Sequence, residues 1–240
     1  MDPAPDGLLL VDKPPGVSSA HVVGRVKRAL PAGVRVGHAG TLDPFATGLL
    51  IVLVGRSTRR CESLMAAAKT YLATIKLGAT TATDDPESPE ILHPGAASGG
   101  DPVGLEAIRQ AIGEFVGEIE QVPPKYSAVK IAGRRACDRV RRGQQVQLQP
   151  RRVRVDQFEI LDYSWPLLRV RITCGRGTYI RALARDLGQR LGVGGYLTEL
   201  RRTRIGGFQV DSAITLEAIN PQTVLQALIP GDGAAATAAQ

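Results

Sequence analysis

A glycine-rich loop that runs directly into an apolar stretch constrains the fold of this 240-residue chain more than any other feature. Residues 36–48 hold three glycines, one histidine and a single carboxylate, Asp43. The stretch that follows, Leu49–Val54, has the length and composition of a buried strand. A strand fixed in a core would hold the preceding loop still. The sequence therefore predicts that this loop presents Asp43 as a reactive side chain.

The chemistry open to Asp43 is limited by what surrounds it. An Asp-Pro pair alone marks the start of a turn. The loop lacks the G-x-x-x-x-G-K-[ST] and G-x-G-x-x-G patterns of phosphate-binding loops. A single acid also does not match the paired carboxylates of ordinary glycosidases. A lone aspartate can still act as a covalent or electrostatic catalyst at a sugar carbon. From the residues alone, a plain turn and a catalytic aspartate both stay open.

Charge is distributed unevenly along the chain. The net charge is +7, but residues 1–124 hold 11 basic and 14 acidic groups, whereas residues 125–204 hold 19 basic and six acidic groups. A solvated basic face is one explanation. Because glycine-rich and aromatic segments interrupt the basic residues, binding to a phosphate backbone is the favoured one. A polyanion is therefore expected to meet mainly the second half of the chain.

Three cysteines and three histidines are widely spaced, without a C-x-x-C pair or metal-ligand spacing. This pattern is typical of reduced thiols in a cytoplasmic protein, and it predicts neither a disulfide framework nor a metal site. The acidic, proline-rich N-terminus differs from a signal peptide. The apolar runs are too short to span a bilayer, so no membrane association is expected.

Mixed strands and helices without a strict alternation predict an α+β fold with a mixed, largely antiparallel sheet flanked by helices. Apolar periodicity predicts strands at 7–11, 49–53, 71–77, 153–161, 167–173 and 196–203, and helices at 18–30, 57–69, 104–115 and 178–191. In the last helix, Arg181, Arg185 and Arg190 are expected to point outward. Residues 80–104 contain five acids and no Lys or Arg, which predicts an exposed, flexible insert. One domain over residues 1–230 and a disordered tail at 231–240 complete the expected organisation.

Several motifs occur in an order that resembles the TruB-type tRNA pseudouridine synthases. The loop around Asp43 resembles the signature loop of that family, and residues 7–16 (GLLLVDKPPG) resemble its opening strand and Lys-Pro turn. Other matching segments are Lys69–Tyr71, Tyr126–Lys130 with Gly133–Ala136, Gly177–Arg181 with Asp186–Gly188, and Leu200–Thr203. Together they cover residues 7 to about 217, nearly the whole chain.

The resemblance implies a role for each matching residue. Asp43 would be the catalytic nucleophile. The residues expected to contact the substrate nucleotide or its loop are His38, Tyr71, Tyr179, Arg181 and Leu200. Arg181 would hold Asp43 in its charged form or meet a phosphate, and an exposed helix arginine is the alternative. A mobile basic thumb at about 122–146 would clamp the RNA, and the residues expected on phosphates are Lys13, Lys130, Arg134, Arg135, Arg141 and Arg142.

The activity that the resemblance implies is isomerisation of uridine 55 in the T-arm loop of tRNA, without cofactor or metal and by a monomer. Many relatives continue into a C-terminal RNA-binding domain of the PUA type, and this sequence is expected to be a short form without a complete one. Two alternatives stay open: the same chemistry on another RNA, including guide-RNA-dependent relatives, and a non-catalytic protein that binds or folds tRNA.

Overall fold

The computed structural model describes residues 4–94, 103–127, 129–131 and 133–231; the side chains of Lys130, Ile131, Arg134 and Arg135 also lie outside the described part. The chain forms two compact units, residues 1–72 with 200–240 (unit 1) and residues 73–199 (unit 2). Strands β4 (Lys69–Leu77) and β12 (Gly195–Ile205) contribute residues to both units. The expectation of one domain over residues 1–230 stays a prediction.

In unit 1 the strands are hydrogen-bonded in the order β14–β1–β3–β12. The long central pair, β1 (Gly7–Lys13) and β3 (Thr47–Val54), is antiparallel over its whole length. β12 joins β3 in parallel at Thr47 and Gly48. The shorter strands are β2 (Val36–His38) antiparallel to β3, β13 (Phe208–Gln209) antiparallel to β12, and β14 (Ile214–Thr215) parallel to β1.

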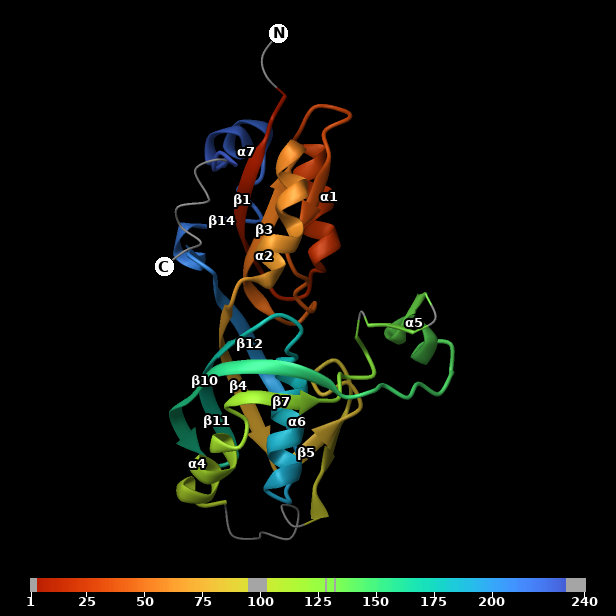
Figure 1. The fold of residues 1–240 in the computed structure, drawn as a ribbon, viewed down its shortest axis with the longest axis vertical. Coiled ribbons are helices and arrows are strands. Elements are labelled where there is room, and N and C mark those ends of the chain that lie inside the picture. The colour runs from red at the N-terminus through yellow and green to blue at the C-terminus, as the bar shows by residue number, and fades with distance from the viewer. Residues whose placement is uncertain (1–3, 95–102, 128, 132, 232–240) are drawn as a thin grey trace. The chain divides into compact units, whose positions relative to one another are not determined.

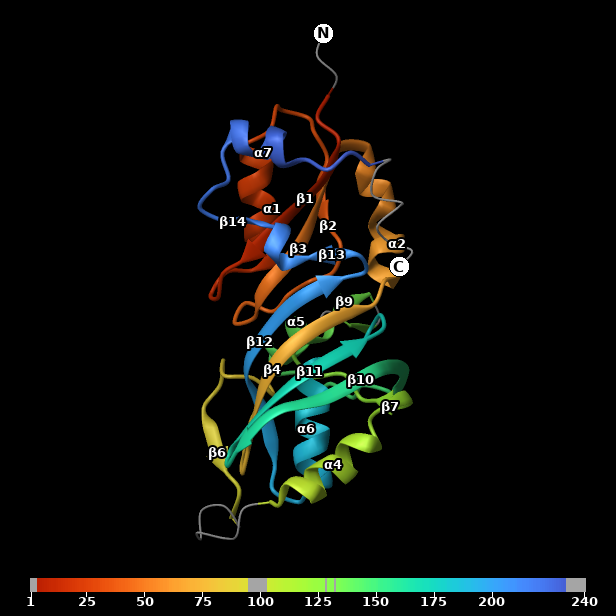
Figure 2. The same cartoon turned by 90° about the vertical axis from the view of Figure 1, so that its left-hand side faces the viewer.

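Both faces of the β1–β3 pair are buried, which explains why these strands are almost continuously apolar. Leu49, Ile51 and Leu53 face one core cluster together with Leu64 of α2 (Cys61–Ala66). The alternate residues of β3 face a second cluster, formed with α1 (Ser19–Arg28) and α7 (Pro221–Ala227). Figure 2 shows α1 and α7 on one side of the strands and α2 on the other. The predicted buried strand behind the loop is therefore confirmed.

The predicted helix at 57–69 is wrong in its extent. The structure has a 3-10 helix, η1 (Gly55–Arg60), followed by the short α2. Asp6 accepts a hydrogen bond from the backbone N–H of Ser57 at 2.7 Å, and the carbonyl of Ala68 accepts one from Gly206 at 2.8 Å. The first bond holds the start of η1, and the second holds the chain between α2 and β4. A second 3-10 turn, η2 (Val210–Ser212), precedes β14.

In unit 2 the strands are hydrogen-bonded in the order β12–β4–β11–β10–β7. The predicted pairing of 153–161 with 167–173 is confirmed as the antiparallel pair β10 (Arg151–Ser164) and β11 (Leu167–Cys174). β7 (Gly117–Gln121) is antiparallel to the other edge of β10. Figure 1 shows α4 (Leu105–Gly113) and α6 (Ile180–Arg190) beside these strands. The predicted α+β fold with a largely antiparallel mixed sheet is confirmed.

The predicted acidic insert and the predicted thumb segment contain short elements. β5 (Ala79–Thr81) and β6 (Glu90–Leu92) pair as an antiparallel hairpin within the acidic segment, of which residues 95–102 lie outside the described part. The expected thumb segment holds β8 (Lys130–Ile131), β9 (Arg134–Arg135) and α5 (Ala136–Val140). Within the described residues, no helix is long and apolar enough to cross a membrane.

Candidate active site

The loop that carries Asp43 joins β2 to β3 in unit 1. Its first residue after β2, Ala39, donates a hydrogen bond to the carbonyl of Ile51 at 3.0 Å. The backbone N–H of Ala46 donates to the carbonyl of Asp43 at 3.2 Å, which closes a turn around the aspartate. Asp43 itself is half-buried. The loop is thus tied to β3 at its start and folded back on itself at the carboxylate.

Ser19, at the first turn of α1, clamps the residue that precedes Asp43. Its buried hydroxyl accepts a hydrogen bond from the N–H of Leu42 at 2.9 Å and donates one to the carbonyl of Leu42 at 3.0 Å. The helix starts here because Ser18 caps it, accepting from the N–H of His21 at 3.1 Å. Both polar groups of the Leu42 backbone are therefore fixed by a single side chain.

Lys13, the last residue of β1, clamps the residue that follows Asp43. Its ammonium donates to the carbonyls of Pro14 at 3.0 Å, Val17 at 2.8 Å and Pro44 at 3.0 Å. The side chain is 0% exposed. The prediction that Lys13 contacts RNA phosphates is wrong, because a fully buried ammonium cannot reach a ligand in solvent. Its contacts are those of a structural support for the loop.

Arg202, in β12, holds the loop from the opposite end of the chain. Its guanidinium, 1% exposed, donates to the carbonyl of Leu49 at 2.8 Å, to that of Gly40 at 3.1 Å and to that of Thr41 at 3.4 Å. The backbone of Arg202 also lies so close to Gly48 that a Cβ there would be 2.2 Å from its carbonyl oxygen. Only glycine fits this position, which also has a φ of +100°.

The roles of Ser19 and Arg202 were not predicted from the sequence. Arg202 stands in the matched segment Leu200–Thr203, which was the one available signal. Nothing in the sequence around Ser19 distinguishes it from a helix-capping serine. Their function depends on hydrogen bonds to residues more than 20 positions away, and local sequence does not encode such partners.

His38 ends β2, immediately before the loop, and is half-buried. Desolvation lowers the pKa of His38 below its ordinary value, and the positive charge of Arg202 lowers it further. The imidazole is therefore neutral near neutral pH. A neutral ring suits packing against a nucleotide better than pairing with a phosphate.

Tyr71 in β4 and Leu200 in β12 are the other predicted site residues of unit 1. Both side chains are buried in the free protein. β4 and β12 are neighbouring strands, and Thr203 of β12 donates to the carbonyl of Thr70 at 3.2 Å. The predicted contact of these two side chains with a uracil ring stays a prediction.

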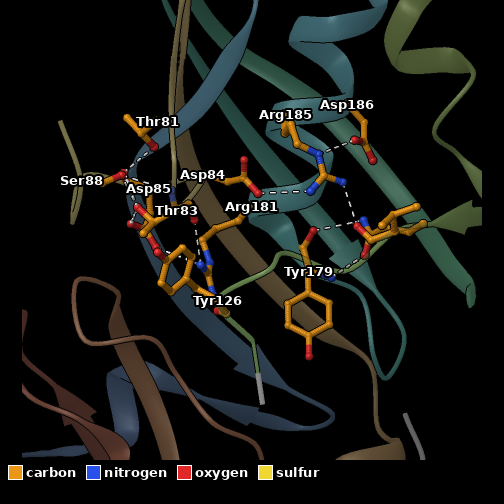
Figure 3. A network of polar contacts seen from close by, with 12 residues as sticks. Thr81, Thr83, Asp84, Asp85, Ser88, Tyr126, Tyr179, Arg181, Arg185 and Asp186 are labelled. Atoms are coloured by element: carbon orange, nitrogen blue, oxygen red, sulfur yellow. Dashed lines mark hydrogen bonds and ion pairs between the residues drawn. The ribbon is translucent and has the colours of Figure 1, made fainter. Parts of the chain in front are cut away.

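Unit 2 positions Arg181 in a buried polar network (Figure 3). The guanidinium donates to the carboxylate of Asp85 at 3.0 Å, to the carbonyl of Thr83 at 2.9 Å and to the carbonyl of Tyr126 at 2.9 Å. The side chains of Arg181 and Asp85 are 4% and 2% exposed. The alternative of an exposed helix arginine is therefore wrong.

This network also corrects the expectation of an exposed acidic insert. Asp85 is buried, since it pairs with Arg181 and accepts hydrogen bonds from the hydroxyl of Thr83 at 2.5 Å and the N–H of Glu87 at 3.0 Å. The first part of the segment is a structured turn around an ion pair. Asp101 lies outside the described residues.

One turn further along α6, Arg185 lies between two carboxylates (Figure 3). It pairs with Asp84 at 3.2 Å and with Asp186 at 2.8 Å. Desolvation raises the pKa of both carboxyl groups, and the charge of Arg185 offsets part of that rise. Arg185 is only partly exposed, so the prediction that it points freely outward is wrong as well.

Tyr179 precedes α6 and is held through its backbone. Its N–H donates to the side chain of Gln121 at 2.8 Å, and its carbonyl accepts from the same side chain at 3.1 Å. The ring extends away from these contacts (Figure 3). Gln121 is buried and forms the last residue of β7. The backbone is thus fixed, and the residue is half-buried.

The structure describes the side chains of only some of the thumb residues that are predicted to contact phosphates. Arg141 and Arg142 are exposed and follow α5. The side chains of Lys130, Arg134 and Arg135 lie outside the described part of the chain. Among the residues that the structure covers, no cluster of three or more His, Cys, Asp or Glu side chains has the arrangement of a metal site.

Comparison with known families gives two matches that together span most of the chain. Residues 27–180 match the N-terminal domain of the TruB family pseudouridylate synthases. Residues 181–228 match the C-terminal domain of tRNA pseudouridylate synthase B.

Among curated proteins, tRNA pseudouridine synthase B of Leifsonia xyli is 50% identical over 96% of this chain and 76% of its own length. The protein of the same name from Mycobacterium avium is 49% identical over 90% of this chain and 70% of its own length.

Among solved structures, the crystal structure of a Cbf5-Nop10-Gar1 complex contains a similar chain, with a TM-score of 0.71 and 30% identity over 95% of this chain. An H/ACA RNP bound to a substrate RNA containing 2′-deoxyuridine gives a TM-score of 0.67 and 28% identity. This chain spans 61% and 60% of those two chains. With more than half of its residues matched by one family model and about half of its aligned positions identical to curated members, the chain belongs to the TruB family of pseudouridylate synthases.

Proposed function

We propose that the protein converts uridine 55, in the T-arm loop of tRNA, to pseudouridine, and that Asp43 is the catalytic residue. The observation that carries the proposal is the clamping of the Asp43 loop. Ser19, Lys13 and Arg202, all buried, fix the backbone on both sides of the aspartate. Catalysis requires a reactive group held in one geometry before the substrate arrives, and this arrangement supplies it.

The reaction is a rearrangement within one nucleotide. The bond between C1′ of the ribose and N1 of the uracil breaks, the base rotates, and a new bond forms between C1′ and C5. The proton on C5 is released and N1 gains one, so atoms and electrons balance without an oxidant or a cofactor. Asp43 promotes the first step, either by attack at C1′ or by removal of a ribose proton, because positive charge develops on the sugar as the bond breaks.

The target nucleotide must leave the base stack before it can react. We assign contact with the extruded uracil to Tyr71, Tyr179 and Leu200, which offer two aromatic rings and an aliphatic side chain. His38, neutral at physiological pH, packs against the RNA loop. For Arg181 we keep the role of supplying positive charge for the aspartate; its burial against Asp85 speaks against contact with a phosphate in solvent.

The relatives named tRNA pseudouridine synthase B support tRNA as the substrate. The excess of basic residues between positions 125 and 204 supports binding of a polyanion, to which Arg141 and Arg142 contribute exposed charges. Splayed loop nucleotides are the parts of RNA that proteins read most readily, which favours the T-arm loop. We expect a monomer that acts in the cytoplasm.

A second candidate is the same chemistry on another RNA, and the similarity to Cbf5 in H/ACA complexes favours it. The lower identity to those chains than to the curated TruB proteins ranks it below tRNA.

The test is to incubate the protein with unmodified tRNA transcript and to map pseudouridine by carbodiimide modification and primer extension. The proposal predicts product at position 55 with the wild type and none with Asp43→Asn. Product at a different position or only in another RNA would support the second candidate. RNA binding without product in the wild type would support a non-catalytic tRNA-binding protein.

A further inference from the structure

Two adjoining hollows open on unit 1 beside His38. The first, of about 570 Å³, is lined by residues of α1, β2, β3, η1 and α2, and includes Lys27, Arg35 and His38. The second, of about 550 Å³, includes Arg35, Arg56 and Arg59. They share Gly33, Val34, Arg35 and Thr58 in their linings, so they adjoin one another. We call the two hollows together the α1–η1 groove.

The charged side chains that line the α1–η1 groove are all positive. Its cations are Lys27, Arg35, Arg56 and Arg59, and neither lining contains Asp or Glu. Arg56 pairs with Asp6 at 3.3 Å, but its side chain is 85% exposed, so this pair contributes little. Lys27, Arg35 and Arg59 have no carboxylate partner in the described part of the chain.

These cations differ from the structural ones in the same unit. Lys13 and Arg202 are buried and bonded to backbone carbonyls, which explains their presence. Lys27, Arg35 and Arg59 are exposed, and no described contact uses their charge. Like charges gathered along a hollow repel one another and raise the local positive potential, which attracts a polyanion.

The lining also indicates which part of an RNA would lie there. It contains no Phe, Tyr or Trp, and its one aromatic ring, His38, stands at the end next to the Asp43 loop, so the rest of the lining offers no surface for stacking bases. Cations without stacking partners contact phosphates and carry no sequence information. His38 belongs to the lining and also ends the strand before the Asp43 loop, so the groove leads to the candidate active site.

We propose that the α1–η1 groove binds the phosphodiester backbone of the RNA strand that flanks the target uridine, through Lys27, Arg35 and Arg59. The inference rests on the proposed function, since it takes the RNA from the reaction assigned to Asp43. It places a phosphate-binding surface in the first half of the chain. Counting charges by halves of the sequence predicted such a surface mainly in the second half.

The test compares two double variants of the full chain in binding to an unmodified T-arm stem-loop RNA at several salt concentrations. Arg35→Gln with Arg59→Gln removes two groove charges. Arg28→Gln with Arg204→Gln removes two exposed charges of unit 1 outside both linings. Each lost phosphate contact lowers the slope of log affinity against log salt by about 0.7 to 0.9. The groove variant is therefore expected to lose about 1.4 to 1.8 from the slope, and the control variant to keep the wild-type slope.

Equal salt slopes for the groove variant and the wild type would overturn the inference. An equal loss of slope in the two double variants would also overturn it, because it would indicate general charge attraction. Thermal unfolding of both variants confirms that they are folded. Because affinity is read from the fraction of RNA bound and not from product, the outcome is separate from that of the pseudouridine mapping. A reduced salt slope for the groove variant, together with no pseudouridine from the wild type, would refute the proposed reaction but still support RNA binding by the groove.

Discussion

Lys13 shows what a single buried charge contributes to this protein. Its ammonium satisfies three backbone carbonyls, of which Pro44 belongs to the candidate catalytic loop. A carbonyl left without a donor and out of reach of water costs about 1–3 kcal/mol. Lys13→Met is therefore expected to lower the urea midpoint of unfolding strongly. Lys27→Met, which removes the same group from an exposed position, is the control, and equal midpoints for the two variants would refute the supporting role of Lys13.

His38 predicts a pH dependence of stability. Desolvation, with a smaller effect of Arg202, lowers its pKa in the folded state, so the unfolded chain binds the proton more readily. The free energy of unfolding should therefore fall as the pH is lowered through about 6.5, the ordinary pKa of histidine, towards the folded value. His38→Gln should reduce this fall. Urea unfolding at pH 7.5 and pH 5.5 measures the difference, and parallel profiles for variant and wild type would contradict it.

At the scale of elements, β12 holds the catalytic loop through Arg202. Lysine keeps the charge but lacks the planar fork of donors with which the guanidinium spans the carbonyls of Gly40, Thr41 and Leu49. Arg202→Lys is therefore expected to displace the loop and to lower the single-turnover rate of pseudouridine formation about 10- to 100-fold, since small displacements of reactive groups have effects of that size. Arg204→Lys, at an exposed position of the same strand, is the control. A wild-type rate for Arg202→Lys would show that the loop holds without this contact.

The ion pair of Arg181 and Asp85 connects α6 to the segment between β5 and β6. Removing one partner of a buried pair costs about 3–5 kcal/mol, because the other charge stays buried. Asp85→Asn should therefore destabilise the protein by about that amount. Asp84→Asn is the matched comparison: desolvation raises the pKa of Asp84, so its charged form is already disfavoured and an amide costs less. Thermal unfolding that ranks the two variants in the opposite order would contradict this assignment.

At the scale of the whole molecule, the sequence predicted what depends on neighbouring residues. The apolar run of β3, the pairing of β10 with β11 and the loop around Asp43 all follow from local pattern. The partners of charged side chains did not, because they come from far along the chain. Arg181 donates a hydrogen bond to Thr83, 98 positions away in the sequence, and Lys13 donates one to Pro44, 31 positions away. Each was predicted to be at the surface because charged residues usually are.

Charge counting over long segments failed for a related reason. Residues 1–124 are slightly acidic in total, but residues 1–72 hold nine basic and five acidic groups, and four of the nine line the α1–η1 groove. The acids that balance the sum belong largely to unit 2, where Asp84 and Asp85 pair with arginines of α6. Summing the whole half therefore concealed a basic surface that the fold assembles.

The central claim is that the clamped carboxylate of Asp43 performs the bond cleavage, and release of tritium from RNA labelled at C5 of the target uridine tests it most directly. The label leaves only when C5 bonds to the ribose. Wild-type protein should release it in a single turnover. Asp43→Asn should bind the same RNA with unchanged affinity and release none. Tritium release by the variant at the wild-type rate would contradict the account.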